Sequence, residues 1–256
     1  MLYVKSVPLY RKVGKKLIQM IHAGVIMDNV LPSEEALSKM FGVSRSTIRE
    51  ALSELTSQGI ITKRQGIGNI VMDSAVNTRF RIDLKLDFAG MLAEGGYRPR
   101  FVQSLSRFEE LSVDDMQGEF FVYDELLFAD DQAAAAFRIH ILRNKFETEP
   151  PVDLPKSNFF SFIFDYTSEV INHSIVHFEA ALADETTGRR FGVTPGSPLL
   201  SWKEVFYTVR DEQVCHNRIY FNPNIFTPTM LRASFDPEES PDNLECEVTA
   251  DLESYL

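Results

Sequence analysis

The pattern of apolar and polar positions near the start of the chain predicts three short helices. From Leu9 to His22 apolar residues recur every three or four positions, and lysines and arginines occupy the other faces, as in an amphipathic helix. Ser33 is a good N-cap for a second helix that ends at Gly42. Ser44 is a good N-cap for a third helix that ends at Gly59. The chain therefore opens with a helical unit in which the second and third helices are joined by a tight turn.

A small β-hairpin is predicted next. Residues 60–62 and 69–72 are β-prone, and the turn between them is basic and contains two glycines. Residues 73–83 lack a sustained apolar period, so we expect a linker in this region.

The rest of the chain mixes short β-like stretches with two helical ones and predicts an α+β domain. The β-like stretches are 120–128, 134–142, 174–182, 199–209 and 213–221, and the helical ones lie near 88–95 and 159–170. The segment from Ala233 onward has 8 acidic and no basic residues, as in a solvated tail. We expect a domain made of the three helices and the hairpin over 1–75, a linker over 76–84, a large domain over 85–235 and an acidic tail over 236–256.

Charge is distributed unevenly between these domains. The whole chain of 256 residues has a formal charge of −11, but up to Thr78 it has 10 Lys or Arg and 6 Asp or Glu, a charge of +4, which leaves −15 for the remainder. Contact with phosphates depends on the local sign, so the N-terminal domain remains a candidate for nucleic-acid binding. Two cysteines, Cys215 and Cys246, are too few for a disulfide framework and suit a reducing compartment. With no targeting or membrane-spanning stretch, we expect a cytoplasmic protein with no membrane partner.

The third predicted helix has the chemistry needed to enter the major groove of DNA. Arg45 and Arg49 are four residues apart and share a face away from the apolar stripe, and arginine pairs bidentately with guanine. Hydroxyls and free backbone N–H groups at the helix start are natural phosphate ligands. The glycines of the hairpin allow its tip to approach a duplex closely. The predicted DNA-binding residues are Ser33, Ser44, Arg45, Ser46, Thr47, Arg49, Lys63, Arg64, Gly66 and Gly68. The alternative is that Arg45 and Arg49 only solvate a helix face and pair with Glu50 or Glu54.

Residues 8–72 resemble the winged-helix domain of GntR-type bacterial regulators. The resemblance rests on Leu31-Pro32-Ser33-Glu34, Phe41-Gly42-Val43-Ser44-Arg45, Thr47-Ile48-Arg49-Glu50-Ala51-Leu52 and the Leu55 to Ile61 segment. It implies that Arg45 and Arg49 contact bases or phosphates, that Ser44, Ser46 and Thr47 contact phosphates, and that the Gly66 region enters the minor groove. Glu35 departs from the family, whose members commonly have arginine there, so site preference or affinity should differ.

The large domain resembles the UTRA effector-binding domain of the HutC-like branch of that family. The matching segments are Ala183 to Thr187, Phe191 to Leu199 and Tyr220-Phe221-Asn222-Pro223. The resemblance implies a mainly antiparallel sheet similar to that of chorismate lyase. Arg138 and His140 share one face of a predicted strand, where they could clamp a phosphate or a carboxylate; the alternative is an exposed edge face. The resemblance adds Glu204, Tyr207, Asn217 and Arg218 to the effector-binding residues.

These features together predict a DNA-binding transcriptional regulator, a repressor whose affinity for a double-stranded operator changes with a small-molecule effector. We expect an anionic effector, such as a phosphorylated sugar or a carboxylate, and a homodimer because one small winged helix makes few contacts. An enzyme or metabolite-binding protein with a lyase-like fold is the alternative, although we expect no catalytic residues and no cofactor. His173-x-x-x-His177 with Glu179 is the best metal motif, but it falls on a β-like segment, so no metal site is predicted.

Overall fold

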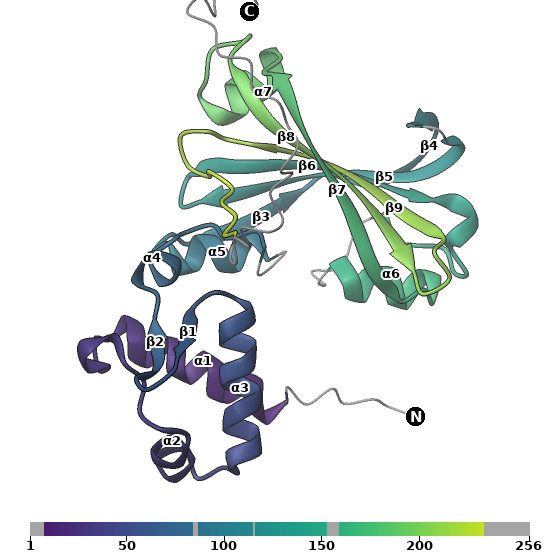
Figure 1. The fold of residues 1–256 in the computed structure, drawn as a ribbon. Coiled ribbons are helices and arrows are strands. Elements are labelled where there is room, and N and C mark those ends of the chain that lie inside the picture. Colours follow the sequence, from purple (N-terminus) through teal and green to yellow (C-terminus); the bar gives the residue numbers. More distant parts are fainter. Residues whose placement is uncertain (1–7, 84–86, 115, 153–158, 233–256) are drawn as a thin grey trace, which may run out of the picture. The chain divides into compact units, whose positions relative to one another are not determined.

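A computed structural model describes residues 8–83, 87–114, 116–152 and 159–232 of the chain, which divides into two compact units (Figure 1). Of the described residues, the first unit comprises 8–77 and 230–232, and the second comprises those within 78–229. The predicted acidic tail lies outside the described residues.

The first unit has the three predicted helices and the predicted hairpin. Its elements are α1 (Leu9–His22), the 3-10 turn η1 (Met27–Asn29), α2 (Glu34–Phe41), α3 (Arg45–Ser57), β1 (Ile61–Arg64), β2 (Gly68–Val71) and the single turn α4 (Asp73–Val76). The side chains that these helices direct inward form one apolar core, in which Leu17, Leu37 and Ile48 are completely buried. The expected helix-turn-helix and wing are confirmed.

The ends of α2 and α3 follow from the capping residues. Ser33 Oγ accepts a hydrogen bond from the backbone N–H of Ala36, and Ser44 Oγ accepts one from that of Thr47, each at 3.2 Å. Each serine thus satisfies one N–H group that the first helical turn leaves without a partner. Gly42 ends α2 with a φ of 64°, a left-handed conformation that favours glycine. This turn brings the start of α3 close to α2.

The second unit is built on one antiparallel sheet. Its strands are β3 (Pro99–Gln103), β4 (Arg107–Val113), β5 (Met116–Ala129), β6 (Gln132–Leu142), β7 (Ile171–Leu182), β8 (Pro198–Thr208) and β9 (Gln213–Phe221), and its helical segments are α5 (Phe88–Glu94), η2 (Arg143–Lys145), α6 (Phe159–Thr167) and α7 (Glu185–Phe191). The strand order is β3-β5-β6-β9-β8-β7, and β4 pairs with the first half of β5. The α+β class and the mainly antiparallel sheet are therefore confirmed.

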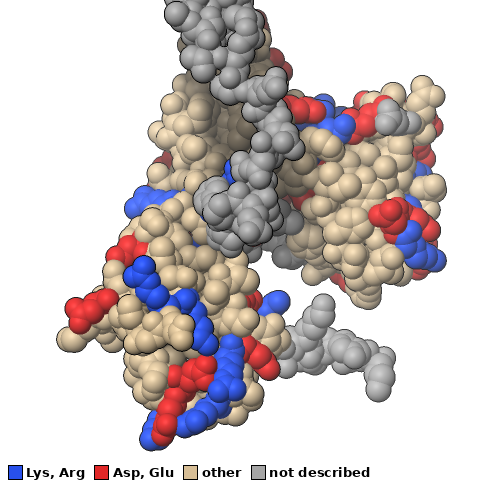
Figure 2. Space-filling model, in the orientation of Figure 1, with Lys and Arg blue, Asp and Glu red and all other residues tan. Residues whose placement is uncertain are grey.

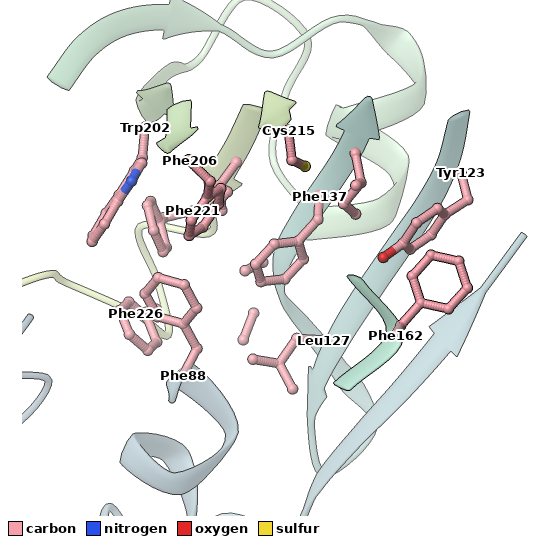
Figure 3. Packing of buried hydrophobic residues seen from close by; sticks show 14 of the residues in the cluster. Phe88, Tyr123, Leu127, Phe137, Phe162, Trp202, Phe206, Cys215, Phe221 and Phe226 are labelled. Atoms are coloured by element: carbon pink, nitrogen blue, oxygen red, sulfur yellow. The ribbon is translucent and has the colours of Figure 1, made fainter. Parts of the chain in front are cut away.

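Alternation along the strands gives this sheet two chemically different faces. We call the face that packs against α5 and α6 the inner face; Phe137 and Ile139 of β6 lie on it. Phe88 of α5 lies among Phe137, Trp202, Phe221 and Phe226, with ring centroids 5.4–5.8 Å apart (Figure 3). The opposite face, the outer face, has Arg138 and His140 of β6, and α7 covers one end of it through Phe191.

The structure differs from the sequence-based expectations in two segments. Strands β3 and β4 were not predicted, because β3 is short and mostly exposed and β4 is interrupted by charged residues. Part of the expected linker is packed into the second unit. The ring centroids of Phe80 and Phe226 are 4.5 Å apart, and the backbone N–H of Ile82 donates to the carbonyl of Thr229 at 2.9 Å. Phe80 and Ile82 thus supply the apolar contacts that fix the beginning of this unit.

Candidate nucleic-acid interface and ligand site

The two arginines predicted to contact bases lie at the start of α3 and are open to solvent. Arg45 is the first residue of the helix and Arg49 follows one turn later, with 58% and 68% of their side chains exposed. The buried residues of α3, Ile48, Ala51, Leu52 and Leu55, form the opposite stripe. Docking of that stripe on the core leaves both guanidinium groups pointing away from the unit.

Both arginines form ion pairs with carboxylates of α2, which the sequence analysis did not predict. Arg45 Nη2 lies 2.6 Å from Glu35 Oε2, and Arg49 Nε lies 2.7 Å from Glu34 Oε2. The alternative partners considered for them were Glu50 and Glu54, but Glu54 instead lies 3.6 Å from Arg11 of α1. Basic and acidic side chains consequently alternate over this part of the first unit (Figure 2).

The predicted hydroxyl residues gather at the N-terminus of α3. Ser44 Oγ lies 2.8 Å from both Ser46 Oγ and Thr47 Oγ1, beside the first N–H groups of the helix. Three hydroxyls next to free backbone donors form a suitable phosphate contact. Ser33, predicted to join them, lies at the start of α2, where its oxygen already accepts from Ala36.

The predicted wing residues lie together in the hairpin. Lys63 and Arg64 are exposed on β1. Gly66 and Gly68 have φ values of 79° and 115°, which side-chain-bearing residues rarely adopt. The strand β2 is attached to the helical core by the backbone N–H of Leu31, which donates to the carbonyl of Asn69 at 2.8 Å. All ten predicted DNA-binding residues therefore belong to one folded unit, in three groups: the two arginines, the hydroxyls and the wing.

The structure does not bring the six predicted effector-binding residues together on one face of the sheet. Arg138, His140 and Arg218 lie on the outer face, whereas Glu204 and Asn217 lie on the inner face. Asn217 and Arg218 are neighbours on β9 and must point to opposite faces of a strand. Tyr207 lies beyond a register shift at the end of β8, where its ring stacks on His173 at 5.0 Å between centroids.

The two outer-face arginines are already paired with carboxylates of other strands of the sheet. Arg138 donates to both carboxylate oxygens of Asp124, at 2.8 and 3.1 Å, and Arg218 Nη1 lies 2.6 Å from Glu179. Burial raises the pKa of Asp124, but the hydrogen bonds from Arg138 together with the charges of Arg138 and of nearby arginines outweigh burial, so the pKa is lowered. Burial also lowers the pKa of His140, which keeps this imidazole neutral near pH 7. An anion clamp formed by Arg138 and His140 would have to displace Asp124 first.

The inner face carries polar groups in an otherwise apolar setting. Glu204 is 2% exposed, its Oε1 accepts from Ser174 Oγ at 2.6 Å, and burial raises the pKa of this carboxyl to about 7. Asn217 is the register partner of Glu204, and its Oδ1 lies 3.1 Å from Cys215 Sγ. Near the other edge of the inner face, burial likewise raises the pKa of Glu125 to about 7. Such groups facing an apolar interior are characteristic of ligand sites.

The histidine motif considered for a metal lies along the extended strand β7. His173 and His177 are four positions apart on this strand, so their Cα atoms are roughly 13 Å apart. That distance is too long for both imidazoles to bind one ion. In the described part of the chain, no three His, Cys, Asp or Glu side chains are grouped as metal ligands would be.

Comparisons with known proteins agree with both units. Residues 9–71 match the family described as "Bacterial regulatory proteins, gntR family", and residues 119–227 match the UTRA domain. The mannosyl-D-glycerate transport/metabolism system repressor MngR of Escherichia coli is 30% identical over 177 residues, which cover 67% of each chain. The chain belongs to the GntR family. It is a transcriptional regulator of this family, with a UTRA domain in its second unit.

Other GntR-family relatives extend the match over most of the chain. The transcriptional repressor NagR of Bacillus subtilis is 28% identical over 235 residues, 86% of this chain and 93% of its own. The solved structure of the possible transcriptional regulator YydK of Bacillus subtilis covers 88% of this chain and 99% of its own, with a TM-score of 0.67 at 15% identity, a likeness of fold. Among the helices of this GntR-family chain that the structure describes, none has the length and apolar character to cross a membrane.

Sequence reasoning missed two kinds of functional candidate in this GntR-family protein. The sequence analysis gave Glu34 no role of its own, although its position opposite α3 makes it the partner of Arg49. Ser174 and Glu125 were not singled out, because their burial depends on strand pairing and on the helices that cover the inner face. The alternation of Tyr123, Glu125 and Leu127 along β5 was the one available signal for a carboxylate facing the core.

Proposed function

We propose that this GntR-family protein is a repressor that binds an operator in double-stranded DNA as a homodimer and responds to a small-molecule effector in its UTRA domain. The observation that carries the proposal is the start of α3, where exposed Arg45 and Arg49 lie beside a group of hydroxyls and unpaired helix N–H groups. That arrangement offers donors to guanine edges and ligands to the adjacent phosphates.

Three further observations support DNA binding and repression. The wing presents Lys63 and Arg64 on a hairpin whose two glycines allow close approach to a duplex. The positive charge up to Thr78 lies in the same segment as the helices and the wing. Two of the relatives, MngR and NagR, are described as repressors.

For the effector we propose a site on the inner face of the sheet around Glu204 and Asn217. The support is the group formed by Ser174, Glu204, Cys215 and Asn217, which is polar, buried and adjacent to the aromatic core. Binding at the inner face would act on α5 and α6, which pack on it. The outer-face alternative, Arg138 with His140 and Arg218, requires the ligand to replace Asp124 and Glu179.

The inner-face chemistry favours a ligand rich in hydroxyl or amino groups over a simple anion. Glu204 and the carbonyl of the Asn217 amide accept hydrogen bonds, whereas Arg138 and Arg218 point away from this face. One relative is described as the repressor of a mannosyl-D-glycerate system, and the hydroxyl groups of that compound support a hydroxyl-rich metabolite. No cofactor or metal is required for this function.

The homodimer follows from the size of the DNA-contacting surface. One α3 and one wing contact a few base pairs, and regulators of this type gain affinity from two half-sites. Exposed phenylalanines of the second unit supply candidate apolar interface area: Phe101, Phe160, Phe164 and Phe178.

The experiment that tests DNA binding is selection from randomised duplexes followed by titration of the enriched operator. We expect the wild type to enrich a sequence and the Arg45→Ala, Arg49→Ala double variant to lose preference for it. Arg98→Ala is the control, because it removes one exposed arginine from the second unit. An operator shift unchanged in the double variant would contradict the assignment of α3.

The effector site is tested with the ligand that copurifies with the native protein, identified by mass spectrometry. We expect Glu204→Gln to abolish the effect of that ligand on operator affinity and Arg138→Ala to preserve it. The reverse pattern would assign the effector to the outer face. Catalytic consumption of the ligand by the purified protein would favour the lyase-like enzyme instead.

A further inference from the structure

The side chain of Glu35 bridges the two helices of the helix-turn-helix at the surface proposed to contact DNA. Its Oε2 lies 2.6 Å from Arg45 Nη2, and its Oε1 lies 3.0 Å from Lys39 Nζ. Glu35 is in the first turn of α2 and Arg45 is the first residue of α3, so the pair lies at the start of both helices. Because both residues lie on helices of one folded unit, the carboxylate stays near Arg45 when that arginine docks.

Stability does not account for this arrangement. The Glu35, Arg45 and Lys39 side chains are 54%, 58% and 77% exposed, and ion pairs between such exposed groups contribute little to folding. Electrostatics alone would also disfavour a carboxylate here, because DNA phosphates repel it. A carboxylate at this position needs a hydrogen-bond donor on the DNA if binding is not to be weakened.

The major groove offers such a donor. Arginine pairs with O6 and N7 of guanine, and glutamate accepts from the N4 amino group of cytosine. Arg45 Nη2 and Glu35 Oε2 lie 2.6 Å apart, so the two residues present a donor and an acceptor side by side. This combination suits neighbouring guanine and cytosine edges.

We propose that Glu35 is a specificity-determining residue, whose carboxylate accepts a hydrogen bond from the exocyclic amino group of a cytosine next to the base that Arg45 contacts. This inference rests on the proposed function, since it assumes that α3 enters the major groove. On DNA without an amino group at that position the carboxylate would be desolvated without a partner, which penalises other bases.

The test is selection from a randomised duplex library by the full-length wild type and by Glu35→Ala, Glu35→Gln and Glu54→Gln. The last is a matched control: it removes one carboxylate from the same unit, where Glu54 pairs with Arg11. Each enriched sequence is then titrated with every base pair substituted in turn at one salt concentration.

We expect the wild type and Glu54→Gln to discriminate for cytosine at one position of each half-site by about tenfold. Glu35→Ala should lose that preference and keep the others. Glu35→Gln, which retains an acceptor oxygen, should keep part of it. Circular dichroism spectra should be alike in all four proteins.

Two results would overturn the inference. Glu35→Ala could raise affinity for all sequences equally with unchanged base preferences, which would make Glu35 a general repulsive charge. It could also leave both affinity and preferences unchanged, which would make it an inert surface residue. A wild type that enriches no sequence at all would instead overturn the proposed function, and the inference with it.

Discussion

Arg49 lies one helical turn beyond Arg45 and is the more exposed of the two. In the free protein its Nε is paired with Glu34, an exposed contact that DNA can displace at small cost. The exchange of a surface carboxylate for a guanine edge is favourable because two fixed acceptors match the fork of the guanidinium group.

Replacing Arg49 with alanine should therefore weaken binding to the selected operator by about 1 to 3 kcal/mol if it contacts a base. Fluorescence anisotropy of labelled operator at fixed salt measures this change. Arg98→Ala should leave the affinity unchanged. Equal losses on the operator and on unrelated DNA would indicate a phosphate contact instead.

The buried carboxyl of Glu204 should make the stability of the folded protein depend on pH. Burial raises the pKa of its carboxyl from the usual 4.5 to about 7, so the folded protein binds this proton more tightly than the unfolded chain does. The stability that this proton contributes is complete below pH 4.5 and is lost as the pH rises through 7.

Glu204→Gln is neutral at every pH and should gain stability relative to the wild type between pH 5 and pH 8, by up to about 3 kcal/mol. Urea unfolding followed by the fluorescence of Trp202, the one tryptophan of the chain, reports on the unit that contains Glu204. The exposed Glu110→Gln provides the control. A pH-independent difference between Glu204→Gln and the wild type would show that the carboxylate is not buried in this way.

At the scale of the elements, the turn between α2 and α3 depends on the backbone of Gly42. Its φ is 64°, and a Cβ added there would meet nothing within 4 Å, so the cost of a side chain is conformational and not steric. Gly14 lies in the middle of α1 with ordinary helical geometry, and a Cβ there would meet only Leu55 Cδ2 at 4.0 Å.

The two glycines should consequently respond to alanine with opposite signs. Gly42→Ala should destabilise the first unit by about 1 to 2 kcal/mol. Gly14→Ala should stabilise it by about 0.4 to 1 kcal/mol. Thermal unfolding followed by circular dichroism at 222 nm measures both. Destabilisation by Gly14→Ala would mean that α1 packs more tightly against α3 than the structure indicates.

The elements also show what the sequence could predict. Local signals were sufficient for α1 to α3, because Ser33, Ser44 and Gly42 define the helix ends with their own chemistry. Strand β4 could not be predicted, since its stability comes from pairing with β5 and not from an apolar pattern of its own. The sequence did not predict that the listed effector-binding residues lie on two faces of the sheet, because which strand face is covered depends on where α5 and α6 pack, a long-range property.

At the scale of the whole molecule, the sequence up to Thr78 is positively charged and the sequence after it is negatively charged. The positive charge lies with the helix-turn-helix and wing, and the −15 charge from Arg79 onward cannot favour DNA, so the UTRA-containing unit needs another role. We propose that this unit carries dimerisation and effector binding.

Sedimentation at micromolar concentration should therefore give a dimer, free and on operator DNA. Pairs of phenylalanines on the second unit can be tested directly: Phe160→Ser with Phe164→Ser should favour the monomer if α6 contributes to the interface, because both side chains are about half exposed in the single chain. A wild type that is monomeric in both conditions would contradict the homodimer.

The central claim is that one ligand-binding unit controls the affinity of one DNA-binding unit, and a single titration tests it most directly. Operator affinity is measured with and without the copurified ligand, at fixed salt, for the wild type. Two states with different ligand affinity predict a change of roughly 5- to 150-fold. Specific DNA binding that is identical with and without a saturating ligand would contradict the account.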